Sequence, residues 1–437
     1  MATIISNFIS KQNEDSSHFL PLEQSEDLDP LLDRIGDSKY VLLGEASHGT
    51  HEYYRWRAEI SKRLIAEKGF SFVAVEGDWP DCYKINRWIK GLPNSGGSIK
   101  EVLQEFSRWP TWMWANWEVA GFAQWLKNYN NDIDPEDKIG FYGLDVYSLW
   151  ESLETLINYL KKEDPETAVL AKRVAECFEP YRANDSYVTA YSGLRQKCKT
   201  EVISLLQEVR ENIPRYKDER EAGLNAELNS LVMKNAEKYY QAMAAFDNSS
   251  WNVRDSHMVE TLNTLMDFHK PDAKVIVWEH NTHIGDARAT DMASHRMHNV
   301  GQLVREQHQD EGVALVGFGS YQGSVIAGEF WGAKMERMEL PKAIEGSLEK
   351  LLHQMGGKNK LFLFDEESPL KETFKEKIGH RAVGVVYDPH RERGNYVPSV
   401  MSDRYDAFLF LDKTKALHPL HIEPEGSKTP DTYPFGI

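Results

Sequence analysis

The sequence predicts an α/β fold, with a mainly parallel sheet core flanked by helices and an inserted helical subdomain. Three observations lead to this prediction. Short apolar runs recur along the chain without strict alternation, which is typical of strands that are covered on both faces. Patterns with helical periodicity separate these runs, as in chains built from strand–helix–strand units. Between about residues 165 and 246 the apolar runs stop, and long, charged amphipathic stretches take their place.

The predicted strands are short segments rich in Val, Ile, Leu, Phe or Tyr. They are Tyr40–Leu43, Phe72–Val75, Ile139–Gly143, Lys274–Trp278, Val313–Phe318, Leu361–Phe364, Arg381–Tyr387 and Ala407–Leu411. The segments between them place apolar residues along one side of a helix. These predicted helices are Tyr53–Lys68, Asp81–Lys90, Val119–Asn128, Leu149–Lys161, Met258–His269 and Met297–Gln307.

The region without apolar runs divides the chain into three predicted parts. Residues 1–164 form the first part of the α/β core, and residues 165–250 form the helical insertion. Residues 251–437 form the second part of the core, and its tail from Lys413 is expected to be an extended closing segment. The charge runs of the insertion are typical of solvated helix faces.

Composition restricts the partners that this chain can have. The chain has 437 residues, of which 41% are hydrophobic, so it can bury a large core. Its 68 acidic and 51 basic residues give a net charge of −17. Because phosphate groups are bound through clustered Lys and Arg, we expect neither nucleic acid nor a membrane as a partner. A small-molecule substrate is the expected partner, and the sequence leaves the oligomeric state open.

Targeting signals and cysteine spacing favour a reduced, cytoplasmic protein. No run of 18 apolar residues is present, and the polar N-terminal segment lacks a basic-then-apolar signal pattern. The three cysteines, Cys82, Cys177 and Cys198, are widely spaced and odd in number. They therefore predict no disulfide framework.

Acidic and imidazole side chains follow four of the predicted strands, at the point where each strand ends. They are Glu45 and His48 after the first strand, Glu76 after the second, Asp145 after the third, and Glu279, His280 and His283 after the fourth. An acid after a strand is often only a helix N-cap. In an open α/β sheet, however, ligands bind beyond the carboxyl ends of the strands. We therefore expect these side chains to converge on one cleft.

The spacing of the glycines disfavours a serine nucleophile. The G-x-S-x-G elbow needs a glycine two residues before the serine and another two residues after it. Around Ser47 the glycines lie three residues before and two after, and around Ser320 they also fall at the wrong offsets. No local signature marks any cysteine as a nucleophile.

The remaining chemistry is activation of water by imidazole and carboxylate. A histidine base needs a neutral ring, and a carboxylate on its other nitrogen usually fixes the tautomer. Glu45 or Glu76 is the expected partner of His48, while His51 is expected to have a supporting role. The segments VLLGEASHG and VIVWEHNTHIG share the order strand, Glu, His and Gly. This echo indicates either duplication or functional pairing across one cleft.

A bound divalent metal is the competing interpretation of the same residues. The spacings His48-x-x-His51 and His280-x-x-His283 each bring two imidazoles close together, although neither matches an established zinc pattern. A mixed histidine and carboxylate set suits zinc, manganese or iron. The candidate ligands are Glu45, His48, Glu76, Glu279, His280 and His283. Our first expectation is that no cofactor is required.

Arginines and tryptophans complete the candidate site. Arg55 and Arg57 lie early in a predicted helix, where a cation is unfavourable unless it holds a carboxylate or an oxyanion. Arg254, next to Asp255, forms either a buried bridge or a substrate clamp. The segment SRWPTWMWANWE holds four tryptophans, which belong either to the core or to the wall of a pocket. The predicted substrate-binding residues are Arg254, Asp145, Trp112 and Trp114.

Six blocks of the sequence together resemble the erythromycin esterase family. They are LLGEASHGTHEYYRWRAEI, FVAVEGDWPDCYKINRWI, GFYGLDVYSLW, NVRDSHMVE, KVIVWEHNTHIGDA and RAVGVVYDPHRERGNYVPSVMSDRYDAFLFLD, in order from about residue 38 to 420. The resemblance implies that His48 is a general base that activates water and that Glu45 and Glu76 belong to the same centre. It also implies that His280, His283 and Arg55 form the rest of the cleft. Similar chains are also labelled succinoglycan biosynthesis proteins.

The resemblance implies a hydrolase that cleaves an ester or lactone bond, since members that act on macrolides open the lactone ring. The expected catalytic residues are His48, Glu45, Glu76, Arg55, His280 and His283. A metal-dependent hydrolase with the same cleft and a non-catalytic small-molecule binding protein are the alternatives. The motifs identify neither the substrate nor a role in macrolide resistance.

Overall fold

A computed structural model describes residues 19–182, 197–216, 221–243, 249–364, 371 and 374–421. The strands are β1 (Leu20–Pro21), β2 (Tyr40–Leu43), β3 (Phe72–Asp78), β4 (Gly140–Asp145), β5 (Val275–Trp278), β6 (Val313–Ala327), β7 (Glu336–Leu340), β8 (Lys360–Leu363), β9 (Ile378–Arg381), β10 (Tyr396–Ser399) and β11 (Ala407–Lys413). The helices of the core are α2 (Asp29–Ile35), α3 (His51–Lys68), α4 (Trp79–Lys90), α5 (Ile99–Gln104), α6 (Trp117–Asn130), α12 (Ser249–Phe268), α13 (Asn281–Ile284), α14 (Val300–His308), α15 (Leu348–Gln354) and α17 (Met401–Arg404).

A nine-stranded sheet forms the centre of the molecule, in the order β1-β8-β11-β6-β2-β5-β3-β4, with β7 paired to β6. The strands from β11 to β4 in this order run parallel to one another. β8 pairs with β11 in the antiparallel direction, as does β1 with β8. The prediction of a mainly parallel sheet flanked by helices is confirmed.

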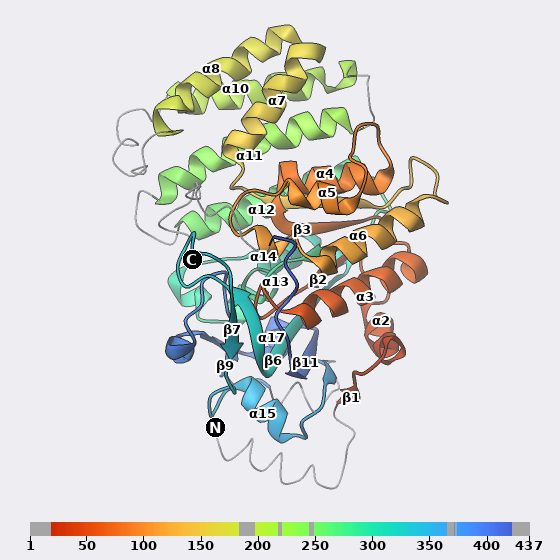
Figure 1. The fold of residues 1–437 in the computed structure, drawn as a ribbon, viewed down its shortest axis with the longest axis vertical. Helices are drawn as coiled ribbons and strands as arrows, with labels where there is room; N and C mark the ends of the chain where they lie inside the picture. Colours follow the sequence, from red (N-terminus) through yellow and green to blue (C-terminus); the bar gives the residue numbers. More distant parts are fainter. Residues whose placement is uncertain are drawn as a thin grey trace.

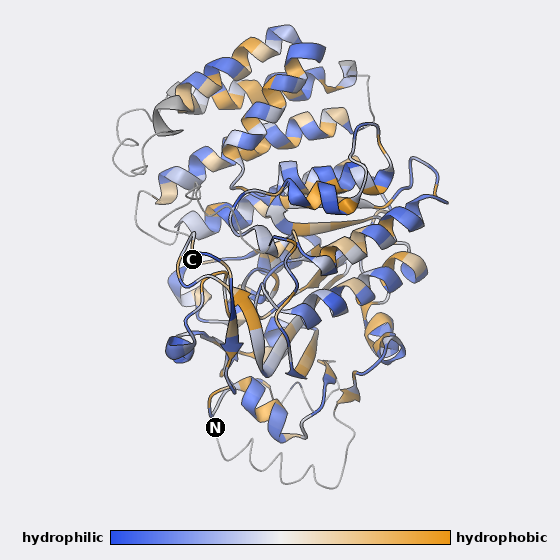
Figure 2. Cartoon of the chain, viewed as in Figure 1, coloured by the Kyte–Doolittle hydropathy of each residue, from blue (hydrophilic) through white to orange (hydrophobic). Residues whose placement is uncertain are grey.

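Helices cover both faces of this sheet (Figure 1). The residues of β2 alternate between the two faces: Val41 and Leu43 pack in the cluster that contains α3 and α6, and Tyr40 and Leu42 pack in the cluster that contains α12 and α14. All four are buried, which explains why the run shows no polar alternation. In Figure 2, hydrophobic residues gather on the strands at the centre of the molecule.

The insertion is helical wherever the structure describes it. Helices α7 (Leu149–Glu163), α8 (Pro165–Arg182), α10 (Lys197–Asn212) and α11 (Ala222–Met243) form a layer at one end of the molecule (Figure 1). Their apolar faces share a hydrophobic cluster of their own, and each helix carries both hydrophilic and hydrophobic residues (Figure 2). Residues 183–196, 217–220 and 244–248 lie outside the described residues, and the division into domains stays a prediction.

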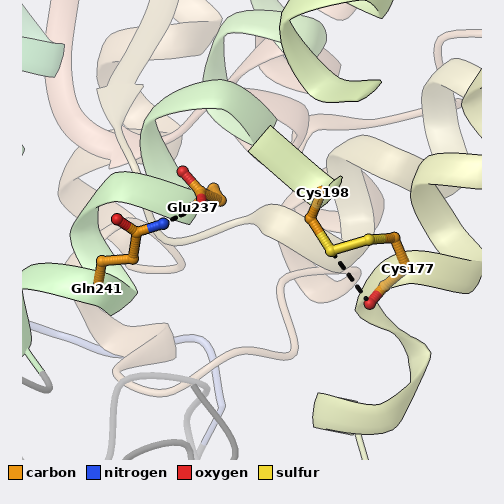
Figure 3. The surroundings of a disulfide bond; sticks show 4 residues. All are labelled: Cys177, Cys198, Glu237 and Gln241. Atoms are coloured by element: carbon orange, nitrogen blue, oxygen red, sulfur yellow. Dashed lines mark hydrogen bonds between the residues drawn. A yellow bond between two sulfur atoms is a disulfide. The ribbon is translucent and has the colours of Figure 1, made fainter. Parts of the chain in front are cut away.

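A disulfide joins two helices of this layer (Figure 3). Cys177 of α8 pairs with Cys198 of α10, with their Cα atoms 5.7 Å apart. The prediction of no disulfide framework is therefore wrong, because packing of α8 against α10 brings together two cysteines that are 21 residues apart. Cys82 remains a free, buried thiol in α4.

The predicted strand Arg381–Tyr387 is also wrong in most of its length. The observed strand β9 ends at Arg381 and pairs with β10 in a separate two-stranded sheet. The next residues cross the end of the main sheet, where the Val383 amide donates a hydrogen bond to the Ala46 carbonyl. The apolar character of this segment thus reflects burial over the loop after β2, not membership of the main sheet.

None of the described helices is long and apolar enough to cross a membrane.

Candidate functional site

The loop between β2 and α3 carries the first two candidate residues. His48 Nδ1 lies 2.9 Å from Glu45 Oε1, and both side chains are buried. Two glycines permit this compact loop: a Cβ on Gly44 would lie 2.1 Å from Asn281 Oδ1, and one on Gly49 would lie 1.9 Å from the Ile326 carbonyl oxygen. The motif therefore keeps glycines where other segments approach closely.

Glu45 is the glutamate that contacts His48, which resolves the choice between Glu45 and Glu76. With Nδ1–H donating to a carboxylate, the neutral ring presents a bare Nε2. His48 also lines the cavity described below.

Arg57, not Arg55, reaches this centre. Arg57 Nη2 donates to Glu45 Oε2 over 2.7 Å, and the arginine is fully buried. Its guanidinium also lies over the rings of Tyr54 and Trp278. Arg55 is exposed on the outer side of α3, over the ring of Trp56. The placement of Arg55 in the cleft is therefore wrong.

A second group of charges forms around Arg254, at the ends of β3 and β4. Arg254 Nη2 lies 2.7 Å from both Glu76 Oε1 and Asp145 Oδ2, and Arg254 Nε lies 3.0 Å from Asp145 Oδ1. The bidentate contact with Asp145 fixes the plane of the guanidinium. Because α12 begins at Ser249, Arg254 lies inside this helix, before the predicted start at Met258. Burial acts to lower the pKa of Arg254, but the charges of Asp145, Tyr147 and Glu76 outweigh burial. The pKa of Arg254 therefore lies well above its ordinary value.

Glu76 joins this group to the loop after β5. Its Oε2 accepts a hydrogen bond of 2.8 Å from the His280 backbone amide. Burial acts to raise the pKa of the Glu76 carboxyl, but the charges of His283, His48 and Arg254 outweigh burial and lower it. Glu76 is therefore an anion that anchors the loop, beside the cavity.

His280 presents a hydrogen-bond donor with no partner among the described residues. Its Nδ1 lies 3.3 Å from the Thr282 amide nitrogen, which can only donate, and 2.8 Å from Thr282 Oγ1; the amide contact favours the tautomer with the proton on Nε2. Nε2 is buried and unpartnered, and the centre of the ring lies 4.9 Å from that of His48. Burial and the nearby charge of His48 lower the pKa of His280 well below its ordinary value, so the ring is neutral.

His283 is held on both nitrogens and lies behind Arg254. Its Nδ1 is 2.9 Å from Asp255 Oδ2, its Nε2 is 3.0 Å from Arg254 Nη1, and its ring stacks on Trp251. Asn281, between the two histidines, binds the backbone of β6 through its side-chain amide. These contacts orient the loop after β5 and leave His283 without a free nitrogen.

Glu279 is buried, and neither of its carboxylate oxygens has a hydrogen-bond partner among the described residues. Burial raises its pKa well above the ordinary value, and the neighbouring charges of Glu76 and Asp255 add to this rise. The raised pKa favours the protonated form of Glu279, in contrast to Glu76, whose pKa is lowered.

A small cavity opens beside His48 and Glu76, with a volume of about 110 Å³. Its wall includes Asp145 and Arg254 together with aromatic side chains from the tryptophan segment, among them Trp109 and Trp114. Trp114 Nε1 donates to the Glu76 carbonyl over 3.0 Å. The prediction for Trp114 as a wall residue agrees with its place, whereas Trp112 is fully buried in the core and does not line the cavity.

The metal-ligand candidates of the cleft do not form a compact set. Among the described residues, the ligand atoms of His51, Glu118 and His418 lie within 4.8 Å of one another, and this group lies outside the cavity. Within the cleft, Glu45 is engaged by His48 and Arg57, and Glu76 by Arg254 and the His280 amide. Whether the enzyme needs a metal there stays a prediction to be tested.

Residues 65–414 match the erythromycin esterase family. The chain belongs to this family. The matched segment begins after Glu45 and His48, so these two residues are supported by the sequence blocks and by their geometry.

Two curated relatives share less than a quarter of their residues with this chain. Erythromycin esterase type II of Escherichia coli is 24% identical over 373 residues, which cover 79% of this chain and 85% of that protein. The putative hydrolase YbfO of Bacillus subtilis (strain 168) is 23% identical over 286 residues, which cover 61% of this chain and 62% of that protein. The family and these names indicate a hydrolase of the esterase type.

Solved structures share the fold at low identity. A succinoglycan biosynthesis protein superposes with a TM-score of 0.75 and 21% identity, covering 95% of this chain and 98% of that chain. A mutant of the erythromycin esterase EreC in its open conformation gives a TM-score of 0.67 and 16% identity, covering 91% and 97%.

Sequence reasoning missed Arg57 as the partner of Glu45. The signal was present, because the buried positions of α3 include Tyr53, Arg57, Ile60 and Leu64, at the three- and four-residue spacing of one helix face. Arg55 lies two positions before Arg57, on the opposite side of the helix.

Proposed function

We propose that this protein is a hydrolase that cleaves an ester or lactone bond with a water molecule activated by His48. The observation that carries this proposal is the pairing of two imidazoles with opposite roles. His48 donates through Nδ1 to Glu45 and offers Nε2 as an acceptor, whereas His280 accepts through Nδ1 and offers Nε2–H as a donor. With ring centres 4.9 Å apart, the proposed base and the proposed oxyanion donor lie side by side, and of the two rings only His48 lines the cavity.

In the proposed reaction, His48 Nε2 takes a proton from water as the water oxygen attacks the carbonyl carbon. The oxyanion that forms accepts a hydrogen bond from His280 Nε2–H. The intermediate then collapses with cleavage of the bond to the leaving oxygen, which receives the proton from His48. The products are a carboxylic acid and an alcohol, or a single hydroxy acid if the substrate is a lactone.

In this proposal the remaining charged residues do not react with substrate; they hold the other residues of the site in place. Arg57 holds Glu45 against His48, and the imidazolium that forms during the reaction is stabilised by that carboxylate. Arg254 makes four hydrogen bonds to Asp145, Glu76 and His283, so we assign it to anchoring the ends of β3, β4 and the β5 loop. Arg254 and Asp145 both line the cavity, and their contact with substrate stays a prediction.

The size of the cavity bears on the substrate. Its volume of about 110 Å³ is below the roughly 300–1,000 Å³ of pockets that hold drug-sized ligands. We therefore propose that a small ester enters as the structure stands, and that a macrolide enters only if the wall opens. Trp109 and Trp331, whose ring centres lie 4.7 Å apart, are the wall residues that would separate. The EreC relative was captured in an open conformation, which supports such a motion.

The proposal is tested with a panel of small esters, lactones and macrolides, each assayed by product formation with and without a chelator. We expect hydrolysis of at least one ester or lactone, with a rate that the chelator leaves unchanged. Turnover that is lost with the chelator and restored by a divalent metal at the cleft would replace this proposal by the metal-dependent alternative. A tight ligand in a thermal-shift screen with no turnover in the whole panel would instead indicate a binding protein.

A further inference from the structure

Outside the cavity, two histidines and a glutamate from three distant segments meet at one point. His51 Nδ1 lies 2.6 Å from Glu118 Oε1, and His418 Nδ1 lies 2.7 Å from the same oxygen. The rings of His51 and His418 meet edge to face, with centres 5.3 Å apart. None of the three residues lines the cavity beside His48.

Backbone pairing holds the three residues in place. His51 is the first residue of α3 and Glu118 lies in the first turn of α6, and these two helices pack side by side (Figure 1). The segment after β11 runs across both helix starts: the His51 amide donates to the Lys415 carbonyl, and the Trp117 amide donates to the His418 carbonyl. The backbone of all three residues is therefore already held in place. This lowers the entropy cost of ordering their side chains around a bound ion.

The donor set has the chemistry of a zinc site. Two imidazoles and one carboxylate form a common three-ligand set for zinc, with water in the fourth position. With zinc–ligand bonds of about 2.0–2.1 Å, tetrahedral ligand atoms lie roughly 3.3 Å apart. The present contacts are shorter by less than an ångström, and the His418 side chain, which is 62% exposed, has room to make this adjustment. Glu118, in contrast, is only 7% exposed and supplies a fixed oxygen.

We propose that His51, Glu118 and His418 bind a zinc ion that fastens the segment after β11 to the starts of α3 and α6. Both Nδ1 atoms lose their protons on binding, because a coordinating imidazole must offer a lone pair. The ion ties together the segment that follows His48 and the segment that ends the tryptophan-rich wall. None of its three ligands lines the cavity of the proposed water-activating centre.

The test uses the full-length protein, stripped with a chelator and titrated with zinc sulfate by isothermal titration calorimetry. We expect one zinc per chain at this site and a higher melting temperature with zinc. His418→Ala should weaken zinc binding by at least about 100-fold and abolish the melting shift, since losing a ligand costs at least as much as losing an outer contact. His390→Ala removes another exposed histidine, away from the cluster, and should bind zinc as the wild type does.

X-ray absorption of the zinc-loaded protein provides the second readout, with a first shell of nitrogen and oxygen that loses one imidazole in His51→Ala. Zinc affinity in His418→Ala equal to that of the wild type would overturn the proposal, as would the absence of zinc binding by the wild type. If the wild type binds no zinc, the cluster is only a set of hydrogen bonds in which Glu118 bridges two imidazoles. Because binding is measured without substrate, failure of the zinc site leaves the proposed hydrolysis untouched. If His418→Ala also retains the hydrolysis rate, the zinc is separated from catalysis.

Discussion

At His48, opposing effects set the charge of the proposed base. Burial favours the neutral ring, but the negative charge of Glu76 and the hydrogen bond and charge of Glu45 outweigh burial, so the pKa of His48 is raised from its ordinary value of 6.5. His280, buried beside it, has its pKa lowered by burial and by the charge of His48. The pKa values of these two neighbouring imidazoles are therefore displaced in opposite directions: His48 accepts a proton only in its neutral form, at a pH above its raised pKa, whereas His280 stays neutral and donates a hydrogen bond in the proposed mechanism.

The raised pKa of His48 predicts the pH dependence of the rate. Because only the neutral ring accepts a proton, kcat/KM should fall as the pH drops through a value above 6.5. Glu45→Gln removes the charge and should move this fall to lower pH while lowering the rate. The measurement is kcat/KM against pH for both proteins. A rate that stays flat between about pH 5 and 8 would contradict the assignment of His48.

Arg57 and Arg55 provide a matched pair of variants on one helix. Arg57→Met leaves Glu45 buried without its cation and should lower the free energy of unfolding by about 3–5 kcal/mol, with a loss of rate. Arg55→Met removes an exposed side chain and should change the free energy of unfolding by less than about 0.5 kcal/mol. Urea unfolding and kcat measure both effects. Equal losses in the two variants would show that Arg57 has no special place at the centre.

At the scale of elements, the strand ends were the most predictable part of the site. Glu45 and His280 follow buried apolar strands, Asp145 ends β4, and Glu76 lies near the end of β3; parallel pairing brings these ends to one edge of the sheet. The choice between Glu45 and Glu76 was not predictable, because it depends on the path of the loop after each strand. The start of α12 at Ser249 was also missed, since the polar residues before Met258 mask the helical pattern.

The disulfide shows what strand and helix patterns leave out. Cys177 and Cys198 are far apart in sequence, and only the packing of α8 against α10 brings their Cα atoms within 5.7 Å. Such pairing follows from tertiary contacts that no local pattern contains.

The disulfide also predicts the behaviour of the helical layer. Reduction should lower the free energy of unfolding of this layer by about 2–4 kcal/mol, because the crosslink restrains the unfolded chain. The site residues lie on other elements, so the hydrolysis rate should change little. Hydrogen exchange of oxidised and reduced protein, followed in α8 and α10, measures the effect. Identical protection in the two states would contradict it.

At the scale of the whole molecule, the helical layer has a hydrophobic cluster of its own, and α11 also packs into the cluster on one face of the sheet. The sheet fixes the ends of β2, β3, β4 and β5, where His48, Glu45 and His280, the residues of the proposed mechanism, lie close together. The fold class was predictable because buried parallel strands leave long apolar runs in the sequence. The cluster of His51, Glu118 and His418 was not, since its members are 67 and 300 residues apart and meet only after the chain end crosses two helices.

The central claim, that His48 activates the attacking water, is tested most directly by the rate of one variant. His48→Ala should lower kcat/KM for the best ester or lactone by about 100-fold or more, with a melting temperature close to that of the wild type. Arg55→Met, on the exposed side of the next helix, is the control and should keep the wild-type rate. If His48→Ala hydrolyses the same substrate at the wild-type rate, the account of the site is wrong.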